Sequence, residues 1–224
     1  MATLAANGPE SWIWWEWVGD HLAEIRTSLW EHIVLTVLSV SIGLIIAIPL
    51  ALLVRRWRRL YGPVLWISGL MYAIPSLALF GVLVPITGLT RTTALIPLVS
   101  YTLLILVRNT VTGLDAVPED VRDAARGMGY TGGRQFVRVE VPLALPAIIA
   151  GIRIATVSTI ALITVTAVIG QDSLGQLILD GLNRDFRTPL VIGIVLTVVL
   201  ATVADLLLLG LQWVATPWTR RRTT

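Results

Sequence analysis

The chain contains no cysteine and no lysine among its 224 residues. Without cysteine it can form no disulfide, no thiolate nucleophile and no cysteine-based metal site. Without lysine it has no P-loop, whose lysine reaches the nucleotide phosphates, and no Schiff-base or serine–lysine chemistry. All 17 basic residues are therefore arginines. Whatever energy the protein uses, it does not hydrolyse ATP through a P-loop of its own.

Charged residues are also scarce, at 14% of the chain, whereas 55% of the residues are hydrophobic. This composition is far too apolar for a soluble domain, and several runs are long enough to cross a bilayer. The sequence therefore predicts an all-α integral membrane protein. A formal net charge of +3 could indicate a nucleic-acid partner. The arginines instead stand in short clusters beside apolar runs, which fits membrane topology, so no nucleic-acid binding is expected.

Five apolar runs have the length of a transmembrane helix. We expect these spans at about residues 28–54, 63–85, 93–112, 143–169 and 189–214. Pro75 lies in the middle of the second run and predicts a kink there, whose freed carbonyl needs a polar or helical neighbour. Between the fourth and fifth spans we expect a mostly polar loop.

The arginines indicate which side of the membrane each loop occupies. With the N-terminus outside, 11 arginines lie in inner segments: Arg55, Arg56, Arg58, Arg59, Arg122, Arg126, Arg134, Arg138, Arg220, Arg221 and Arg222. Four lie in outer segments: Arg26, Arg91, Arg184 and Arg187. Because cytoplasmic loops are enriched in arginine, we predict an outer N-terminus and a cytoplasmic C-terminus.

The predicted transmembrane domain covers residues 28–218, with a segment on each side of it. Residues 1–27 hold Trp12, Trp14, Trp15 and Trp17, and are interpreted as an amphipathic element at the outer membrane interface, retained rather than cleaved. A cage for a cationic ligand is the alternative interpretation, because aromatic faces attract quaternary ammonium. Residues 219–224 are expected to form a basic cytoplasmic tail.

A charged, glycine-punctuated stretch at residues 121–146 separates the third and fourth spans. The sequence Val-Pro-Glu-Asp at 117–120 predicts a helix start, and Gly127 and Gly129 predict its end. A second short helix is expected at 133–140, stopped by Pro142. These helices are interpreted as a docking element, although the residues alone favour a solvated loop.

Two charges lie within predicted spans. Arg153 is about seven residues, or roughly 10 Å, from Pro146, and Asp205 is about eight residues, or roughly 12 Å, from Trp213 at the inner end of the last span. A charge near the middle of a membrane costs about 2.5–3.5 kcal/mol. We therefore expect Arg153 and Asp205 to pair or to face an internal cavity, as a structural clamp or as a moving gate.

The fourth span carries small residues every four positions, at Ala147, Gly151, Ala155 and Thr159. This strip is interpreted as a helix-packing surface rather than a pore lining. Hydroxyl groups also crowd the span, at Thr156, Ser158, Thr159, Thr164 and Thr166. They either line a polar route or bond to the preceding turn of their own helix, and the sequence leaves both interpretations open.

The charged stretch contains a recognisable signature at Asp123-Ala124-Ala125, Gly129, Val139 and Val141-Pro142. It resembles, at the right spacing, the EAA signature of permease subunits of bacterial ABC importers, with Asp for Glu and Val for Ile and Leu. The resemblance implies a type I ABC importer permease fold, with five transmembrane helices and a coupling loop at 113–142 that inserts into a cytoplasmic ATPase. Asp123, Ala124, Ala125, Gly129, Val139 and Pro142 are its implied coupling residues, and Gly129 would supply the turn between the two helices.

Four further stretches look like the osmoprotectant branch of these permeases. They are IPSLAL at 74–79, RNT with GL at 108–114, GIRIATVS at 151–158 and DGLNR at 180–184. The implied solute is glycine betaine, choline, carnitine or proline betaine. Residues 170–175 depart from the family, reading GQDSLG where such permeases often read GAGGLG.

The same resemblance implies the partners. They are cytoplasmic ATPase subunits that bind ATP and Mg, an extracytoplasmic binding protein, and a second permease, identical or related, in the bacterial inner membrane. The chain itself is expected to need no cofactor.

Other functions stay as alternatives. One is import of another small solute such as an amino acid, and another is a structural anchor, which would not need buried charges. A membrane-embedded enzyme would need a cluster of titratable groups, but His21 and His32 lie near the outer end and Asp205 is nearly alone in the spans.

Overall fold

The computed structural model describes residues 13–218, which are helical almost throughout and include no strand. Trp12 and the predicted basic tail therefore lie outside the described residues. The long helices are α2 (Leu22–Arg56), α5 (Arg91–Asp115), α8 (Val141–Ile163) and α10 (Arg187–Ala215). The shorter ones are α1 (Trp15–Asp20), α3 (Tyr61–Ala73), α4 (Ser76–Thr87), α6 (Glu119–Gly127), α7 (Gly132–Gln135) and α9 (Leu174–Asn183). Two 3₁₀ turns, η1 (Arg58–Leu60) and η3 (Thr164–Ile169), and a π-helical turn, η2 (Phe136–Glu140), join them.

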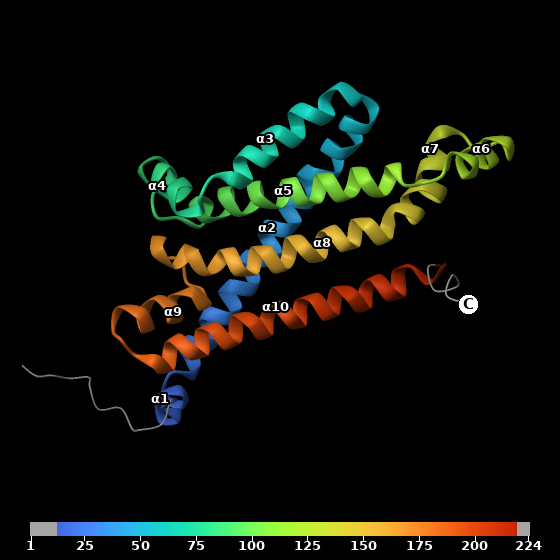
Figure 1. Cartoon of the computed structure of the whole chain (residues 1–224). Helices are drawn as coiled ribbons and strands as arrows, with labels where there is room; N and C mark the ends of the chain where they lie inside the picture. Colours follow the sequence, from blue (N-terminus) through green and yellow to red (C-terminus); the bar gives the residue numbers. More distant parts are fainter. Residues whose placement is uncertain (1–12, 219–224) are drawn as a thin grey trace, which may run out of the picture.

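The long helices form an elongated bundle with different structures at its two ends (Figure 1). The α6 end carries α6 and α7, between the long helices α5 and α8. The α9 end carries α1, α4 and α9. We use these two names below for the ends of the bundle.

Four continuous helical runs are long and apolar enough to cross a membrane: Leu22–Arg56, Arg91–Asp115, Gly132–Ile169 and Arg187–Ala215. They contain the first, third, fourth and fifth predicted spans. Three of them extend by a few residues beyond the predicted bounds, whereas Gly132–Ile169 starts 11 residues before the predicted start at 143 and ends at the predicted end. The predicted second span is present as a broken pair, α3 with α4, so the bundle has the expected five-span organisation.

The second span is broken at Pro75, as its position predicts, and the bend is a full break rather than a mild kink. The run starting at Arg58 and helix α4 meet at 90°. Pro75 favours an extended residue before it, and Ile74 has a ψ of 126°, which ends α3 outright. The neighbouring helix compensates, because the Tyr101 hydroxyl of α5 donates a hydrogen bond of 2.8 Å to the Ile74 carbonyl.

The core lies where α2, α5 and α8 meet. Small residues of α2, Ala47 and Ala51, are fully buried against Leu106 and Val107 of α5 and Ala155 of α8. Small side chains let helix backbones approach closely, which is how helices associate in an apolar solvent. By contrast, the only buried residues of α10, a helix described along its whole length, are Thr188, Pro189 and Gly193.

The prediction of a polar loop between the last two spans is wrong, because residues 174–183 form the helix α9. The Ser173 hydroxyl caps it by accepting a hydrogen bond of 3.2 Å from the Gly175 amide. Leu174 and Leu177 share one helix face and pack with Ile25 of α2. Burial of that face stabilises a helix whose other side is polar.

The hydrogen bond at the broken span makes a stability prediction. Tyr101→Phe removes the only side-chain donor to the Ile74 carbonyl that the described residues show, so we expect a loss of about 1–2 kcal/mol in unfolding free energy. Denaturant titration of the protein in micelles, followed by circular dichroism, measures it. Tyr72→Phe is the matched control, because this neighbouring ring is 46% exposed. Equal stability of the two variants would contradict the assignment.

Candidate functional site

Helix α6 has the ends that its sequence predicts. It begins after Pro118 with Glu119 and Asp120 in the first turn, where acids favour the positive end of the helix dipole. It ends in a Schellman motif: the Tyr130 amide donates to the Ala125 carbonyl at 3.1 Å, and the Gly129 amide donates to the Arg126 carbonyl at 2.9 Å. The φ of Gly129 is +80°, a conformation that glycine adopts without strain.

The residues of the predicted coupling signature divide into exposed and packed ones. Asp123, Ala124 and Gly129 are exposed, and the apolar side chains of Met128 and Val137 are more than 60% exposed beside them. Ala125 is buried, while Val139 and Pro142 are half-buried. The α6–α7 segment therefore presents an exposed surface of mixed character, fixed from beneath by its packed residues.

Pro142 does not stop the second short helix, so that prediction is wrong. The chain from Gly132 to Ile169 is one continuous helical run. Phe136–Glu140 is π-helical, and the Val141 amide donates to the Phe136 carbonyl, five residues back. Pro142 follows at the point where the hydrogen bonds change from the π-helical to the α-helical pattern. Its lack of a backbone N–H therefore falls where the pattern already changes, and the helix is not broken. The α7 segment is thereby joined to the span α8.

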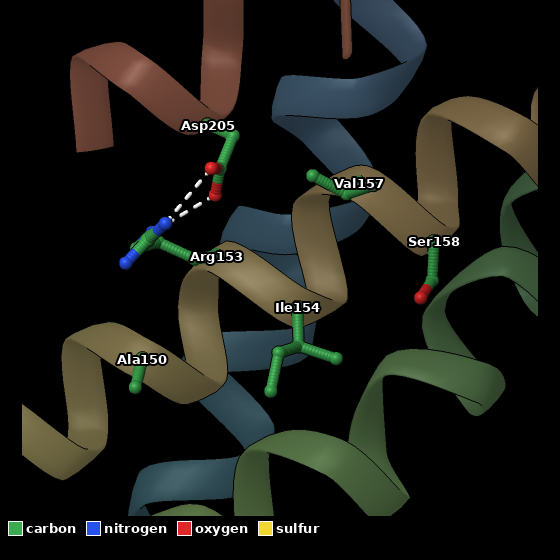
Figure 2. Close-up of a pocket in the computed structure, with 6 residues that line it drawn as sticks. All are labelled: Ala150, Arg153, Ile154, Val157, Ser158 and Asp205. Atoms are coloured by element: carbon green, nitrogen blue, oxygen red, sulfur yellow. Dashed lines mark hydrogen bonds and ion pairs between the residues drawn. The ribbon is translucent and has the colours of Figure 1, made fainter. Parts of the chain in front are cut away.

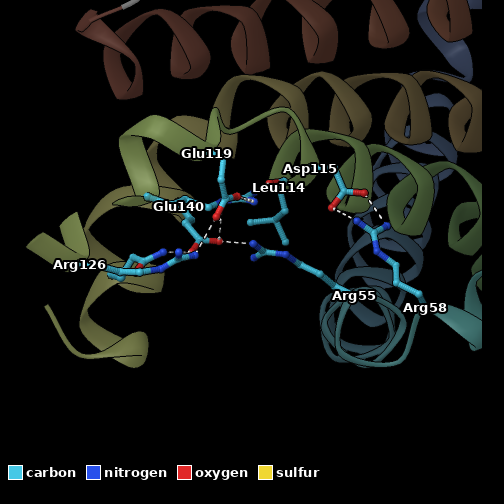
Figure 3. A network of polar contacts seen from close by, with 9 residues as sticks. Arg55, Arg58, Leu114, Asp115, Glu119, Arg126 and Glu140 are labelled. Carbon is cyan, nitrogen blue, oxygen red and sulfur yellow. Dashed lines mark hydrogen bonds and ion pairs between the residues drawn. The ribbon is translucent and has the colours of Figure 1, made fainter. Parts of the chain in front are cut away.

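Glu140 is the centre of a polar network at the α6 end (Figure 3). Its carboxylate is buried and pairs with Arg55 at the end of α2. It also accepts a hydrogen bond of 2.9 Å from Gln135 of α7, and Arg122 of α6 lies 3.9 Å away. A buried carboxylate must be compensated, so Glu140 holds three separate segments at one point.

A ring of more exposed ion pairs surrounds Glu140. Arg122 donates to the Leu114 carbonyl at 2.8 Å and pairs with Glu119, which also pairs with Arg126. Hydrogen bonds from Arg122 and Arg126 hold the pKa of the Glu119 carboxyl below its ordinary value. A further pair in which both guanidinium nitrogens of Arg58 bond to Asp115 at 2.7 Å ties η1 to the end of α5. The α6–α7 segment is thus attached to α2 and α5 as well as to its own flanking helices.

The two intramembrane charges form a pair. Arg153 of α8 donates two hydrogen bonds of 2.8 Å, from Nε and Nη2, to the carboxylate of Asp205 on α10 (Figure 2). A bidentate geometry is the strongest arrangement for these groups. Gln212 adds a second link, accepting from Arg153 and donating to the Pro146 carbonyl.

An open depression of about 470 Å³ lies beside this pair, on the surface of α8 next to Asp205 of α10. Arg153 and Asp205 line it together with Ile154, Val157 and Ser158. Both charged side chains stay partly exposed, at 24% and 35%. Charges that remain exposed at membrane depth face water or protein rather than lipid. This side of α8 and α10 is therefore a candidate lining of a solute pathway.

The small-residue strip of α8 is a packing surface, as its spacing indicates. A side chain at Gly151 would bring its Cβ within 2.5 Å of the Asn109 Cβ on α5. A Cβ at Gly113 of α5 would lie 2.8 Å from the Ala147 Cβ. Ala155 and Thr159 are likewise buried. The strip sets how closely α5 and α8 approach.

The hydroxyl groups of the fourth span divide between the two interpretations. Thr156, Thr164 and Thr166 donate to the carbonyls of Ile152, Ala161 and Ile163 on their own turns. Ser158 instead lines the depression beside Arg153. Most of the hydroxyls satisfy the helix itself, and one faces a possible route.

Two parts of the site escape sequence reasoning. Glu140 lies between two signature residues, Val139 and Val141. The only sign in the sequence that it has a role is that it is charged while its neighbours are apolar. Its partner Arg55 belongs to an arginine cluster that topology alone explains.

Helices of membrane length, an ion pair at membrane depth and a charged loop at one end define the class of this protein as a polytopic membrane protein. The chain belongs to the family of binding-protein-dependent transport system inner membrane components, whose profile matches residues 39–212. It is therefore a multi-pass inner-membrane permease subunit and not an enzyme, and ATP hydrolysis belongs to a separate subunit.

Two relatives extend this similarity over most of the chain. The osmoprotectant import permease protein OsmW of Salmonella typhimurium is 39% identical over 203 residues, covering 88% of this chain and 94% of its own. The glycine betaine/carnitine/choline transport system permease protein OpuCB of Bacillus subtilis is 33% identical, covering 84% and 86%. Among solved structures, the inward-facing MetNI methionine ABC transporter matches with a TM-score of 0.75 at 21% identity, covering 88% of this chain and 98% of that one. The fold is therefore that of a type I ABC importer permease.

The close contact between α5 and α8 yields a prediction. Gly151→Ala forces a Cβ against Asn109, so we expect a loss of about 1–3 kcal/mol in unfolding free energy. Gly210→Ala in α10 meets open space and removes a flexible helix residue, so it should be neutral or slightly stabilising. The two variants are compared by thermal unfolding in micelles. A harmless Gly151→Ala would show that α5 and α8 are not closely packed there.

The Glu140 network predicts a local effect on the α6–α7 segment. Glu140→Gln leaves Arg55 without its buried carboxylate, at a cost of about 2 kcal/mol. We expect trypsin to cleave faster at Arg134 and Arg138 in membranes. Glu119→Gln, which changes an exposed carboxylate, should leave the cleavage rate there unchanged. The role of Glu140 would be refuted if both variants were cleaved like the wild type.

Proposed function

We propose that this chain is the permease subunit of an ABC importer for osmoprotectants that carry a quaternary ammonium group, such as glycine betaine, choline, carnitine or proline betaine. The observation that carries the proposal is its similarity, over nearly full length, to permeases whose names specify osmoprotectants. Choline and carnitine permeases of Bacillus subtilis and Listeria monocytogenes are 32% and 33% identical to it. The methionine transporter does not support the amino-acid alternative, because its 21% identity speaks for the fold alone.

In this proposal the α6 end lies in the cytoplasm, with the C-terminus on the same side and the N-terminus outside. The support is the arginine distribution, since Arg55, Arg58, Arg122, Arg126 and Arg134 all lie at that end. Cytoplasmic ATPase subunits bind ATP and Mg, and the chain needs no cofactor of its own.

The exposed surface of α6 and α7 docks on the ATPase. Asp123 and Ala124 lie on it, and Gly129 ends α6 so that Met128 stays exposed. Ala125 and Pro142 contribute from the packed side. Movement of the ATPase pair reaches the spans through Glu140, because this residue joins α6, α7 and α2.

The solute crosses beside the Arg153–Asp205 pair. A second permease, identical or related, covers the apolar surface of α10, whose exposed residues include Leu206, Leu207 and Leu211. A separate extracytoplasmic binding protein delivers the solute, and the spans alternate between outward and inward access. Of the predicted Trp-rich segment 1–27, the described residues 13–27 lie at the outer interface in this proposal, and residues 1–12 are outside the described part of the chain.

The coupling role of Gly129 provides the test of this function. The chain is reconstituted in vesicles with its ATPase subunits and binding protein, and ATP-dependent uptake of glycine betaine is measured. Gly129→Val strains the positive φ and displaces Met128 and Tyr130, so we expect uptake to fall about tenfold or more while ATP is still hydrolysed.

Two controls separate this effect from a general one. Gly127→Val changes a glycine two residues away that has open space and no positive φ, and should keep most of the uptake. Gly129→Asn restores a residue that tolerates the left-handed region and should recover uptake. Wild-type uptake by Gly129→Val would refute the coupling role. Failure of the wild type to take up any quaternary ammonium solute would refute the substrate class.

A further inference from the structure

The α9 end contains a smaller cavity, far along the chain from the α6–α7 segment and separate from the depression beside Arg153. Its volume is about 130 Å³. Its walls come from α1 and the start of α2, from α9, and from the turn before α10. Two parts of the chain that are distant in sequence, residues 17–24 and 177–189, therefore build it together.

One wall of this cavity is aromatic. The Trp17 ring stacks on His21 at a centroid distance of 4.1 Å and meets the Phe186 ring at 5.5 Å, nearly perpendicular. The Trp14 ring meets Phe186 edge-on at a centroid distance of 6.3 Å, and the Trp14 backbone amide donates to the Thr188 hydroxyl at 2.9 Å. The aromatic residues are thus fixed in place, and such faces attract methylated ammonium groups.

The other wall carries unpaired charges. Glu24, Asp180 and Arg184 line the cavity, and none of the three forms an ion pair among residues 13–218. Asp180 accepts one hydrogen bond, of 3.2 Å, from Gln176. Two carboxylates beside aromatic faces favour a cation, and one guanidinium offers a partner for a carboxylate.

The wall formed by α9 is held firmly. A Cβ at Gly181 would lie 2.6 Å from Leu190 of α10, and one at Gly193 would lie 2.8 Å from Ile178. These two glycines let α9 and α10 pack at close range, so Asp180 and Arg184 project from a fixed surface. A site that is already formed costs less to occupy.

We propose that this cavity binds a small solute that carries both a methylated ammonium group and a carboxylate. The ammonium lies against Trp17 and Phe186 near Glu24 and Asp180, and the carboxylate meets Arg184. A cavity of about 150 Å³ accommodates benzene. The trimethylammonium group is smaller than benzene, so the 130 Å³ of this cavity has room for that part of the solute. The site goes beyond the proposed function, because it puts solute recognition in the permease itself, at the end opposite the ATPase.

Binding is measured on the full chain assembled with its ATPase subunits, without the soluble binding protein. The bilayer contains phosphatidylethanolamine and phosphatidylglycerol, so no lipid carries a methylated ammonium group. Equilibrium dialysis with labelled glycine betaine and labelled choline should show saturable binding of both. Glycine, which lacks the methyl groups, should compete at least about tenfold more weakly.

Three variants test the walls separately. Trp17→Leu should lower the affinity for both solutes about tenfold. Trp15→Leu changes a ring that is 69% exposed and does not line the cavity, so it should leave both affinities unchanged. Arg184→Gln changes an exposed side chain, which leaves the fold intact. It should lower the affinity for glycine betaine about tenfold and leave the affinity for choline unchanged.

The proposal is overturned by any of three results: no saturable binding to the wild type, equal binding by the Trp17→Leu and Trp15→Leu variants, or an equal loss of both solutes in Arg184→Gln. These outcomes do not affect the proposed function, since uptake with the binding protein present is a separate measurement. Conversely, a wild type that binds glycine betaine here and transports none would refute the proposed function and keep this site.

Discussion

The close packing of α5 against α8 is the contact on which the rest of the structure depends. Gly113 and Gly151 remove the side chains that would separate these helices, and the α6–α7 segment is the connection between their ends. Two helices held at backbone distance act as one body, so the position of α6 is determined by the hairpin that carries it. The buried pair of Glu140 and Arg55 then fixes α2 to the same body.

Compensation of buried charge explains both polar clusters. At the α6 end, water can reach most of the arginines, so their pairs are individually weak, and Glu140 matters because it alone is buried among them. At membrane depth, neither Arg153 nor Asp205 is tolerated without the other. The first cluster therefore organises a loop, whereas the second restrains two spans against each other.

The spans could be predicted because the bilayer penalises any uncompensated polar group, so composition and length decide them. The pairing of Arg153 and Asp205 followed from the same penalty. The sequence could not predict the angle at Pro75, because that depends on Tyr101 reaching Ile74 from another helix. The same holds for α9, whose stability comes from burying Leu174 and Leu177 against α2. The role of Glu140 could not be predicted because its partner Arg55 is 85 residues away in the chain.

This division into a rigid body and looser parts limits where a conformational change can occur. A displacement of α6 cannot be absorbed by sliding between α5 and α8, because Gly151 leaves no gap beside Asn109. It must move α2, α5 and α8 together. Helix α10 packs on α9 through Gly181 and Gly193, and it also lies along α8, to which the side chains of Asp205 and Gln212 link it. Its only buried residues are Thr188, Pro189 and Gly193, so most of its surface is open to a further partner. Any motion that separates α8 from α10 must break the two hydrogen bonds between Arg153 and Asp205. Both the clamp and the gate interpretation of the sequence rest on that link.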